Sequence, residues 1–275
     1  MKKIENIGEP LKNWDVKINF GIKTGFNDGF LIDGKTKDEL IKADPKSAEI
    51  IRPILRGRDI DRYRSKFANQ WIINIPCGFT NNERKGREGE IWFKEKYPKI
   101  YTHLVNMNET IQLKKKSKGL YKRTDQGEYW WESRSCAYMD DFSKQKIVWK
   151  RIGSILRFSL DESGYLTLDS TCFATGKHLK YLCSILNSKI GRFLLRQSPK
   201  TGTGDYLVSV QAIEPIRVPM PSEKTLKKIE MLFDELFHNG EIIQASVLDE
   251  LDNVIFEIFQ LNEDEIKFVS AMSPK

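Results

Sequence analysis

The chain has 275 residues, of which 40% are hydrophobic and 30% are charged, a composition typical of a globular protein with a buried core. No apolar run approaches the ~20 residues that a membrane-spanning helix needs, and the N-terminus lacks the apolar stretch of a signal peptide. We therefore expect a cytoplasmic protein whose 4 cysteines are reduced. The cysteines form no CxxC pair and the 3 histidines are isolated, which argues against a structural zinc site.

The net charge of +7 is divided unevenly along the chain. Residues 222–275 contain 5 lysines, no arginine and 12 acidic residues, a net charge of −7, so residues 1–221 carry +14. A basic body favours a nucleic-acid partner, because each neutralised phosphate releases a counterion. A solvated lysine-rich surface explains the charge equally well. We predict a basic domain at 1–221 and an acidic helical tail at 222–275.

The first predicted element is a strand over residues 14–22, where apolar and polar residues alternate. It leads into GIKTGFNDGF (21–30), a segment rich in glycine and small polar residues. Helix signals follow. Thr36 and Glu39 have the spacing of a capping box, and Asp44-Pro45 can begin a second short helix.

A second glycine segment, ILRGRDIDRY (54–63), also holds three arginines. Glycine lets a backbone approach another molecule closely, and arginine offers a planar fork of donors that fits phosphates and the guanine edge. A strand is predicted at 70–75, and the polar residues 81–89 are typical of a loop. A helix is expected around 90–107, interrupted at Pro98.

Consecutive strands are predicted in the second half of the chain, at 146–151, 155–160 and 165–168. They follow a basic, glycine-punctuated loop at 114–127. One amphipathic helix is expected over 178–196 and a flexible loop over 198–206.

Two amphipathic helices, Ser222–His238 and Glu241–Gln260, predict a C-terminal antiparallel hairpin with Gly240 at its turn. A short last helix is expected at 264–271.

Catalytic motifs are absent from the sequence. It contains no nucleotide-binding GxGxxG or GxxxxGK[ST], no HExxH, and no aromatic-flanked Asn-Pro-Pro that holds a flipped adenine. Asp59 or Asp61 with Glu83 and Lys85 imitates the metal-binding triad of a nuclease. Glu83 falls in the predicted loop, and a metal site belongs on rigid elements, which weakens this alternative.

Binding signals are stronger. Tyr129, Trp130, Trp131 and Arg134 in EYWWESR (128–134) could stack on bases, although at least one of the tryptophans is expected in the core. The other cations can also be explained without a nucleic-acid partner. The arginines of 54–63 can pair with Asp59 and Asp61 on the surface, and those near 150 can lie on a solvated strand face.

Several segments, in this order, resemble the TaqI-like C-terminal specificity domain, which is the target-recognition part of adenine-specific DNA methyltransferases and of type IIG restriction–modification enzymes. The resemblance covers about residues 15–221. It is carried by GIKTGFNDGFLID (21–33), DPKSAEIIRPILRGRDIDRY (44–63), YPKIYTHL (97–104), EYWWESR (128–134), KIVWKR (146–151), LDSTCF (168–173), KYLCSILNSKIGRFLL (180–195) and IRVPMP (216–221).

The resemblance implies an α+β fold with a mixed, curved sheet and peripheral helices, and a double-stranded DNA target. It makes 1–221 the recognition domain and 222–275 a tail that packs on it or on a missing catalytic domain. The methyltransferase domain of the family precedes this region, so S-adenosylmethionine, and magnesium where a nuclease is fused, are expected for a parent enzyme rather than for this chain. We expect no metal and no catalytic residue here.

Twelve residues are predicted to contact DNA from the two glycine segments, the aromatic segment, the strand pair and the 198–206 loop: Lys23, Thr24, Asn27, Arg56, Arg58, Arg62, Trp130, Arg134, Lys150, Arg151, Lys200 and Thr201. Three alternatives stay open: an enzyme in its own right, as a stand-alone magnesium-dependent nuclease or a methyltransferase that uses unfamiliar residues; an RNA-binding protein; and a type I restriction specificity subunit, which usually has two recognition domains.

Overall fold

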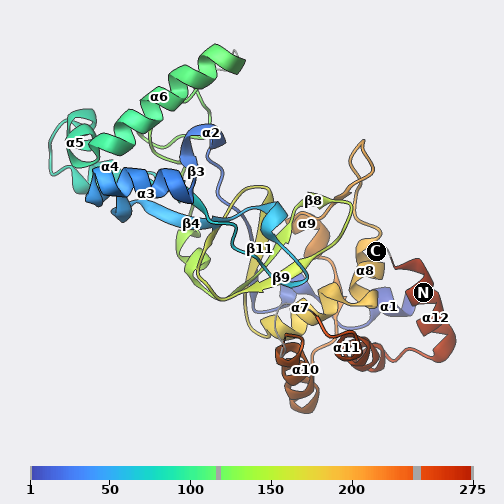
Figure 1. Cartoon of the computed structure of the whole chain (residues 1–275). Helices are drawn as coiled ribbons and strands as arrows, with labels where there is room; N and C mark the ends of the chain where they lie inside the picture. The colour runs from blue at the N-terminus through green and yellow to red at the C-terminus, as the bar shows by residue number, and fades with distance from the viewer. Residues whose placement is uncertain (1, 116–118, 238–242, 274–275) are drawn as a thin grey trace. The chain divides into compact units, whose positions relative to one another are not determined.

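The protein is represented by a computed structural model that describes residues 2–115, 119–237 and 243–273 (Figure 1). The chain forms two compact units. Unit 1 comprises Met1–Gly21, Arg56–Lys66 and Asp141–Lys275, and unit 2 comprises Ile22–Leu55 and Phe67–Asp140. Each unit combines helices and strands, so the mixed α+β class is confirmed. The curvature of the sheet and the division at 221/222 stay predictions.

Unit 1 is built on a five-stranded sheet in the order β2-β11-β7-β9-β5. The first four strands are antiparallel neighbours, and β5 is parallel to β9. Their bounds are β2 Val16–Phe20, β11 Thr171–Gly176, β7 Lys146–Lys150, β9 Phe158–Asp161 and β5 Tyr63–Arg64. The predicted strands at 14–22 and 146–151 are confirmed, and that at 155–160 begins three residues later.

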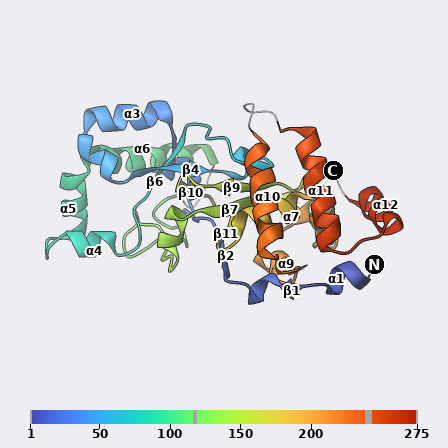
Figure 2. The ribbon, with the colours of Figure 1, turned by 90° about the horizontal axis from the view of Figure 1, so that it is seen from below.

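Helices cover one face of this sheet (Figure 2). Helix α7 packs on β7, β9 and β5, α10 packs on α7, and α11 and α12 pack on α8. Because side chains alternate across a strand, Ile147 and Trp149 of β7 face this helical core, while Val148 lies opposite Phe173 on the other face. The helices are α1 Lys2–Asn6, α7 Leu179–Asn187, α8 Lys189–Leu195, α9 Val210–Ile213, α10 Glu223–Glu235, α11 Ala245–Ile258 and α12 Glu263–Met272.

The single helix predicted over 178–196 is two helices. Ser188 has extended backbone (φ −69°, ψ 170°) and caps α8 by accepting a hydrogen bond from the Gly191 amide. The buried side-chain amide of Asn187 donates to the Phe158 carbonyl. Both residues are short and polar, and they use their side chains to end one helix and begin the next.

The C-terminal helices are confirmed within one to four residues at their ends. Lys228 of α10 lies 3.5 Å from Glu250 of α11, so the two helices are in contact. The turn predicted at Gly240 lies outside the described residues, as do parts of the loop predicted at 114–127, and the antiparallel pairing of the two helices stays a prediction.

In unit 2, β6 (Gln70–Ile73) pairs antiparallel with β3 (Leu31–Asp33) and with β4 (Ile51–Leu55). Helices pack beside these strands and on one another (Figure 1). Their bounds are α2 Asn27–Phe30, α3 Gly34–Ala43, α4 Phe79–Glu83, α5 Gly89–Lys96 and α6 Pro98–Lys115, with the 3-10 helix η2 at Pro45–Glu49. The interruption predicted at Pro98 separates α5 from α6.

Two local predictions for unit 2 are wrong. The N-cap of α3 is Asp33, which accepts from the Thr36 amide at 2.7 Å, so Thr36 is already inside the helix. Glu83 ends helix α4 rather than lying in a loop. The asparagines before it are poor helix formers, but tertiary contacts of the preceding residues override that propensity, as described below.

The remaining short elements are the paired strands β1 Glu9–Pro10 and β13 Arg217–Val218, the paired strands β8 Ile152–Gly153 and β12 Tyr206–Leu207, strand β10 Leu166–Thr167, and the 3-10 helices η1 Leu11–Asn13, η3 Gly57–Asp59 and η4 Met139–Ser143. No helix in the described residues is both long and apolar enough to cross a membrane.

Candidate nucleic-acid interface

One end of the unit 1 sheet brings together two of the predicted segments. Arg58 lies in η3, and Lys150 ends β7. A Cβ on Gly57 would lie 2.9 Å from Cγ of Lys150, and the Gly57 amide donates to Oγ of Ser170 at 3.3 Å. The glycine is therefore needed for close packing of η3 against the end of β7, which places Arg58 beside Lys150.

The 198–206 loop reaches the same end of the sheet. Tyr206 pairs with Gly153, three residues after Lys150, and Lys200 forms a β-bridge with Tyr206. The Lys200 ammonium lies 4.9 Å from the centre of the Tyr206 ring. Nζ of Lys150 lies 3.6 Å from the position that a Cβ on Gly153 would take. We call Arg58, Lys150 and Lys200 the basic row.

The basic row consists of exposed side chains. None of the three cations forms an ion pair with a residue of the described ranges. Two acids, Asp169 and Asp205, lie near the row in sequence, next to Ser170 and Tyr206, and both are half-buried. Arg151, also predicted to contact DNA, is half-buried, and its backbone bonds to Ser170 and Val208 at 2.9 and 2.8 Å, which fixes the turn between β7 and β8.

Arg56 and Arg62 have partners within unit 1. Arg56 forms a bidentate pair with the buried carboxylate of Asp59, at 2.9 Å to each oxygen. Arg62 donates to the Asn187 carbonyl at 2.8 Å and lies over the Tyr63 ring. These contacts give both arginines a role in holding η3 and β5, whether or not they also reach DNA.

In unit 2, Lys23 and Arg134 meet at one carboxylate. Lys23 lies 3.0 Å and Arg134 3.4 Å from Asp125. The side chain of Asp125 is 12% exposed, whereas those of Lys23 and Arg134 are 51% and 58% exposed. The acid is largely covered and both cations face solvent, so two predicted residues far apart in the sequence form one exposed basic pair.

The neighbouring predicted residues of the first glycine segment have different environments. Thr24 is buried, and its hydroxyl donates to Oδ1 of Asn27 at 2.6 Å and accepts from the Phe26 amide at 3.1 Å. The Thr24 side chain therefore organises the turn before α2, whereas Asn27 is exposed at the first position of that helix.

The aromatic segment divides between surface and core. Trp130 is half-buried and meets the rings of Tyr121 and Trp131 edge-on. Trp131 is 1% exposed and stacks between Phe93 and Tyr129, with 4.8 Å between ring centres on each side. The expectation that at least one tryptophan is in the core is confirmed.

Two buried charges that sequence reasoning missed support this segment. The carboxylate of Glu132 accepts from the amides of Gly78, Thr80 and Glu128 at 3.1, 2.8 and 3.0 Å, which holds the start of α4. Arg123 donates to carbonyls that include those of Trp130 and Glu132.

Burial lowers the pKa of Arg123 to about 10, so the guanidinium stays charged at neutral pH. In the sequence, the only signal for Arg123 and Glu132 is their place among glycines and tryptophans, a pattern that predicts a stacking surface instead.

The loop that carries Thr201 is folded on itself. The Thr201 hydroxyl is hydrogen-bonded to the Thr203 hydroxyl at 2.8 Å and accepts a hydrogen bond from the Asp205 amide at 3.2 Å. These bonds are internal, so the Thr201 hydroxyl, predicted as a phosphate donor, is engaged in shaping the loop.

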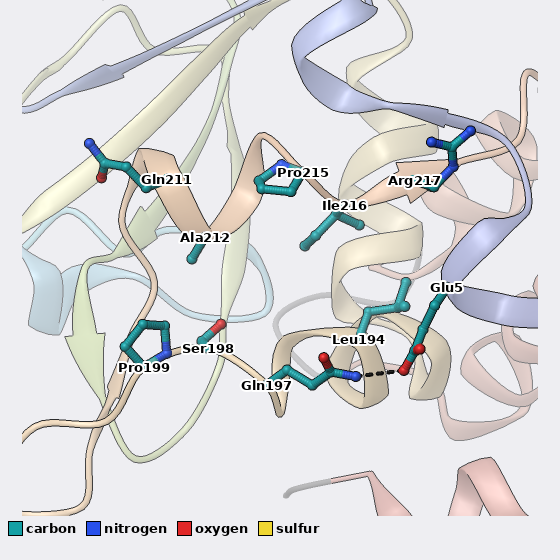
Figure 3. A pocket seen from close by; sticks show the side chains of 10 residues that line it. All are labelled: Glu5, Leu194, Gln197, Ser198, Pro199, Gln211, Ala212, Pro215, Ile216 and Arg217. Atoms are coloured by element: carbon teal, nitrogen blue, oxygen red, sulfur yellow. Dashed lines mark hydrogen bonds between the residues drawn. The ribbon is translucent and has the colours of Figure 1, made fainter. Parts of the chain in front are cut away.

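A pocket of about 330 Å³ lies at the foot of this loop (Figure 3). Gln197 and Glu5 are hydrogen-bonded across it, and Gln211, Ala212 and Pro215 close another side. The lining mixes amides, aliphatic groups, the hydroxyl of Ser198, the guanidinium of Arg217 and a single carboxylate. One acid cannot assemble the set of oxygen ligands that magnesium prefers.

The acidic residues of the nuclease alternative are engaged elsewhere or exposed. Both carboxylate oxygens of Asp59 are bound by Arg56, and Glu83 is exposed on α4. Within 2–115, 119–237 and 243–273, no group of three or more His, Cys, Asp or Glu residues is placed to hold a metal.

Comparison with known proteins identifies the architecture. Residues 52–214 match the family model described as the TaqI-like C-terminal specificity domain. The fold is similar to part of the type IIL restriction–modification enzyme MmeI, whose structure was solved in complex with DNA, with a TM-score of 0.65 at 13% identity. The match covers 96% of this chain and 35% of MmeI, so the chain spans about a third of that enzyme. No curated protein matches the sequence.

Proposed function

Since the chain belongs to the TaqI-like C-terminal specificity domain family, we propose that it recognises a sequence in double-stranded DNA and places an adenine methyltransferase there, as in type IIG-like restriction–modification. Catalysis and the binding of S-adenosylmethionine, or of magnesium if a nuclease is attached, belong in this proposal to an N-terminal domain or subunit. Such an enzyme acts in the bacterial cytoplasm as part of a defence system.

The observation that supports this proposal is the basic row. Arg58, Lys150 and Lys200 come from three separate segments, are exposed, and have no acidic partner among the described side chains. A cation without a partner gains by neutralising a phosphate, because the counterion held there is released. Lys23 and Arg134 of unit 2 form a second exposed basic pair.

The test uses the full chain and a pool of random duplexes. Bound duplexes are recovered and sequenced, and the affinity for the enriched sequence is measured against salt concentration. Recovery of one common sequence supports recognition. Lys150→Gln and Arg58→Gln should each lower affinity and make the logarithmic salt slope shallower by about 1.

The matched control is Lys227→Gln, an exposed lysine of α10 in the acidic tail, which should leave the slope unchanged. Enrichment of no sequence contradicts the proposal, as does equal binding of RNA at physiological salt, which would favour a general RNA-binding protein. Cleavage or methylation of DNA by the purified chain with magnesium or S-adenosylmethionine would contradict the assignment of catalysis to another domain.

A further inference from the structure

Gly202, at the tip of the 198–206 loop, is a glycine that the fold does not require. Its φ lies outside the left-handed region, and a Cβ added there would have no heavy atom within 4 Å. Gly204 differs, because its φ of +87° strains any other residue. A side chain at position 202 would project into open space.

The same tip offers two free amide donors. The amides of Thr201, Gly204 and Asp205 bond within the loop, to the Asp205 carbonyl, the Thr201 carbonyl and the Thr201 hydroxyl. Those of Gly202 and Thr203 donate to no residue of the described chain. Two successive amides of the tip therefore have no acceptor among the described residues, and the first of them belongs to a residue without a side chain.

The loop is anchored at its base. The Leu207 amide donates to the Pro199 carbonyl at 2.7 Å, Lys200 bridges to Tyr206, and Tyr206 pairs with β8. Figure 1 shows the segment between α8 and α9 as a loop that projects from the rest of unit 1. The strand pairing holds the tip in a defined position next to the basic row.

We infer that the tip Thr201–Gly204 contacts a phosphate of the bound DNA through the amides of Gly202 and Thr203, with Lys200 neutralising the same stretch of backbone. This rests on the proposed function. Successive free amides form a concavity that favours an anion, and backbone amides commonly fix a protein on DNA by bonding to phosphate oxygens. The absence of a side chain at 202 lets the backbone approach to hydrogen-bonding distance.

The experiment compares the full-length wild type with Gly202→Val on the duplex enriched from the random pool. A branched side chain in open space should leave the urea midpoint unchanged, but it should block the approach and weaken binding about 10-fold or more, the scale of a charged hydrogen bond. Phosphates of the duplex are then replaced one at a time by uncharged methylphosphonates. At one position the replacement should lower the affinity of wild type about 10-fold and leave the affinity of Gly202→Val unchanged.

The outcomes separate this inference from the proposed function. Wild type that enriches no sequence overturns both. Wild type that enriches a sequence, with Gly202→Val binding equally well, overturns the inference alone. Weaker binding by Gly202→Val with undiminished sensitivity at every methylphosphonate overturns the phosphate assignment and indicates a contact with base edges.

Discussion

At the scale of single residues, the charged and aromatic side chains of the sequence divide into those that face solvent and those that hold the fold. EYWWESR was interpreted as a stacking surface because tryptophan beside arginine suits that role. The structure buries Trp131 and Glu132 and leaves Arg134 exposed. Composition could identify the segment but not this division, because a buried carboxylate depends on amides that lie more than 50 residues away.

Glu132→Gln should destabilise unit 2. The carboxylate accepts three amide hydrogen bonds in a fully buried site, and a glutamine presents one oxygen and an NH₂ that must face at least one of those donors. We expect the free energy of unfolding in urea to fall by about 2–3 kcal/mol. Glu128→Gln, at an exposed neighbour, is the control, and an equal loss in both variants would contradict the structural role.

Arg56 and Arg58 should differ although they are two residues apart. Arg56→Ala leaves the buried Asp59 carboxylate without its bidentate partner, and we expect a loss of about 2–4 kcal/mol in unfolding free energy. Arg58→Ala removes an exposed side chain and should change stability by less than about 0.5 kcal/mol. Thermal and urea unfolding measure both, and similar losses would show that Arg58 is structural as well.

At the scale of elements, periodicity predicted where helices and strands lie but not where they break. The 178–196 pattern is continuous, yet Ser188 caps a new helix. Strand β11, which pairs with a strand on each side, was missed because its first five residues, Thr171 to Thr175, are all buried and show no alternation. Apolar runs of this length are ambiguous by period alone. Asp33 and Ser188 are residue types that often cap helices, but which of the many such residues in the chain begins a helix depends on tertiary packing.

The contact between α6 and α2 should be sensitive to pH. Nε2 of His103 lies 3.1 Å from the Gly29 carbonyl oxygen, and burial lowers the pKa of His103 below its ordinary value of 6.5. Below pH 6.5 the unfolded chain takes up a proton that the folded chain does not, so protonation favours unfolding. Stability from this site is complete above pH 6.5 and falls as the pH drops towards 5.

Urea unfolding at pH 7 and pH 5 checks this expectation in wild type and in His103→Gln. Glutamine can donate to the Gly29 carbonyl but does not titrate, so the variant should lose less stability than wild type between the two pH values. An identical loss in both proteins would show that other groups account for the pH dependence.

At the scale of the whole molecule, the boundary between the basic and acidic parts of the chain is not a boundary of the hydrophobic core. The net charge changes sign at 221/222, yet the apolar faces of α10 and α11 belong to the same core as the sheet residues of unit 1. Unit 1 also draws on three separate segments of the chain. The sequence predicts packing of the tail on the body only as one of two alternatives, because its acidic residues indicate the solvent-facing side of the helices and do not identify the partner of their apolar side. The assembly of unit 1 from three segments could not be predicted.

Removing residues 222–275 should therefore unfold unit 1. The deletion takes away six buried aliphatic side chains of α10 and α11 and exposes the surface of α7 and α8 that they cover: Ile229, Leu232, Val247, Leu251, Val254 and Ile255. At about 1.5–3 kcal/mol for each buried side chain, the loss matches or exceeds the total stability of about 5–15 kcal/mol of a typical protein. Near-ultraviolet circular dichroism and amide NMR dispersion should show lost tertiary packing.

A shorter deletion from residue 262 provides the control. It removes α12, in which Val269 is the buried side chain of the helix as described, and unit 1 should stay folded with a reduced urea midpoint. If the chain ending at 221 instead folds cooperatively and binds duplex DNA more tightly than the full chain, the tail acts by repelling the phosphate backbone. Its acidic surface would then matter more than its apolar face.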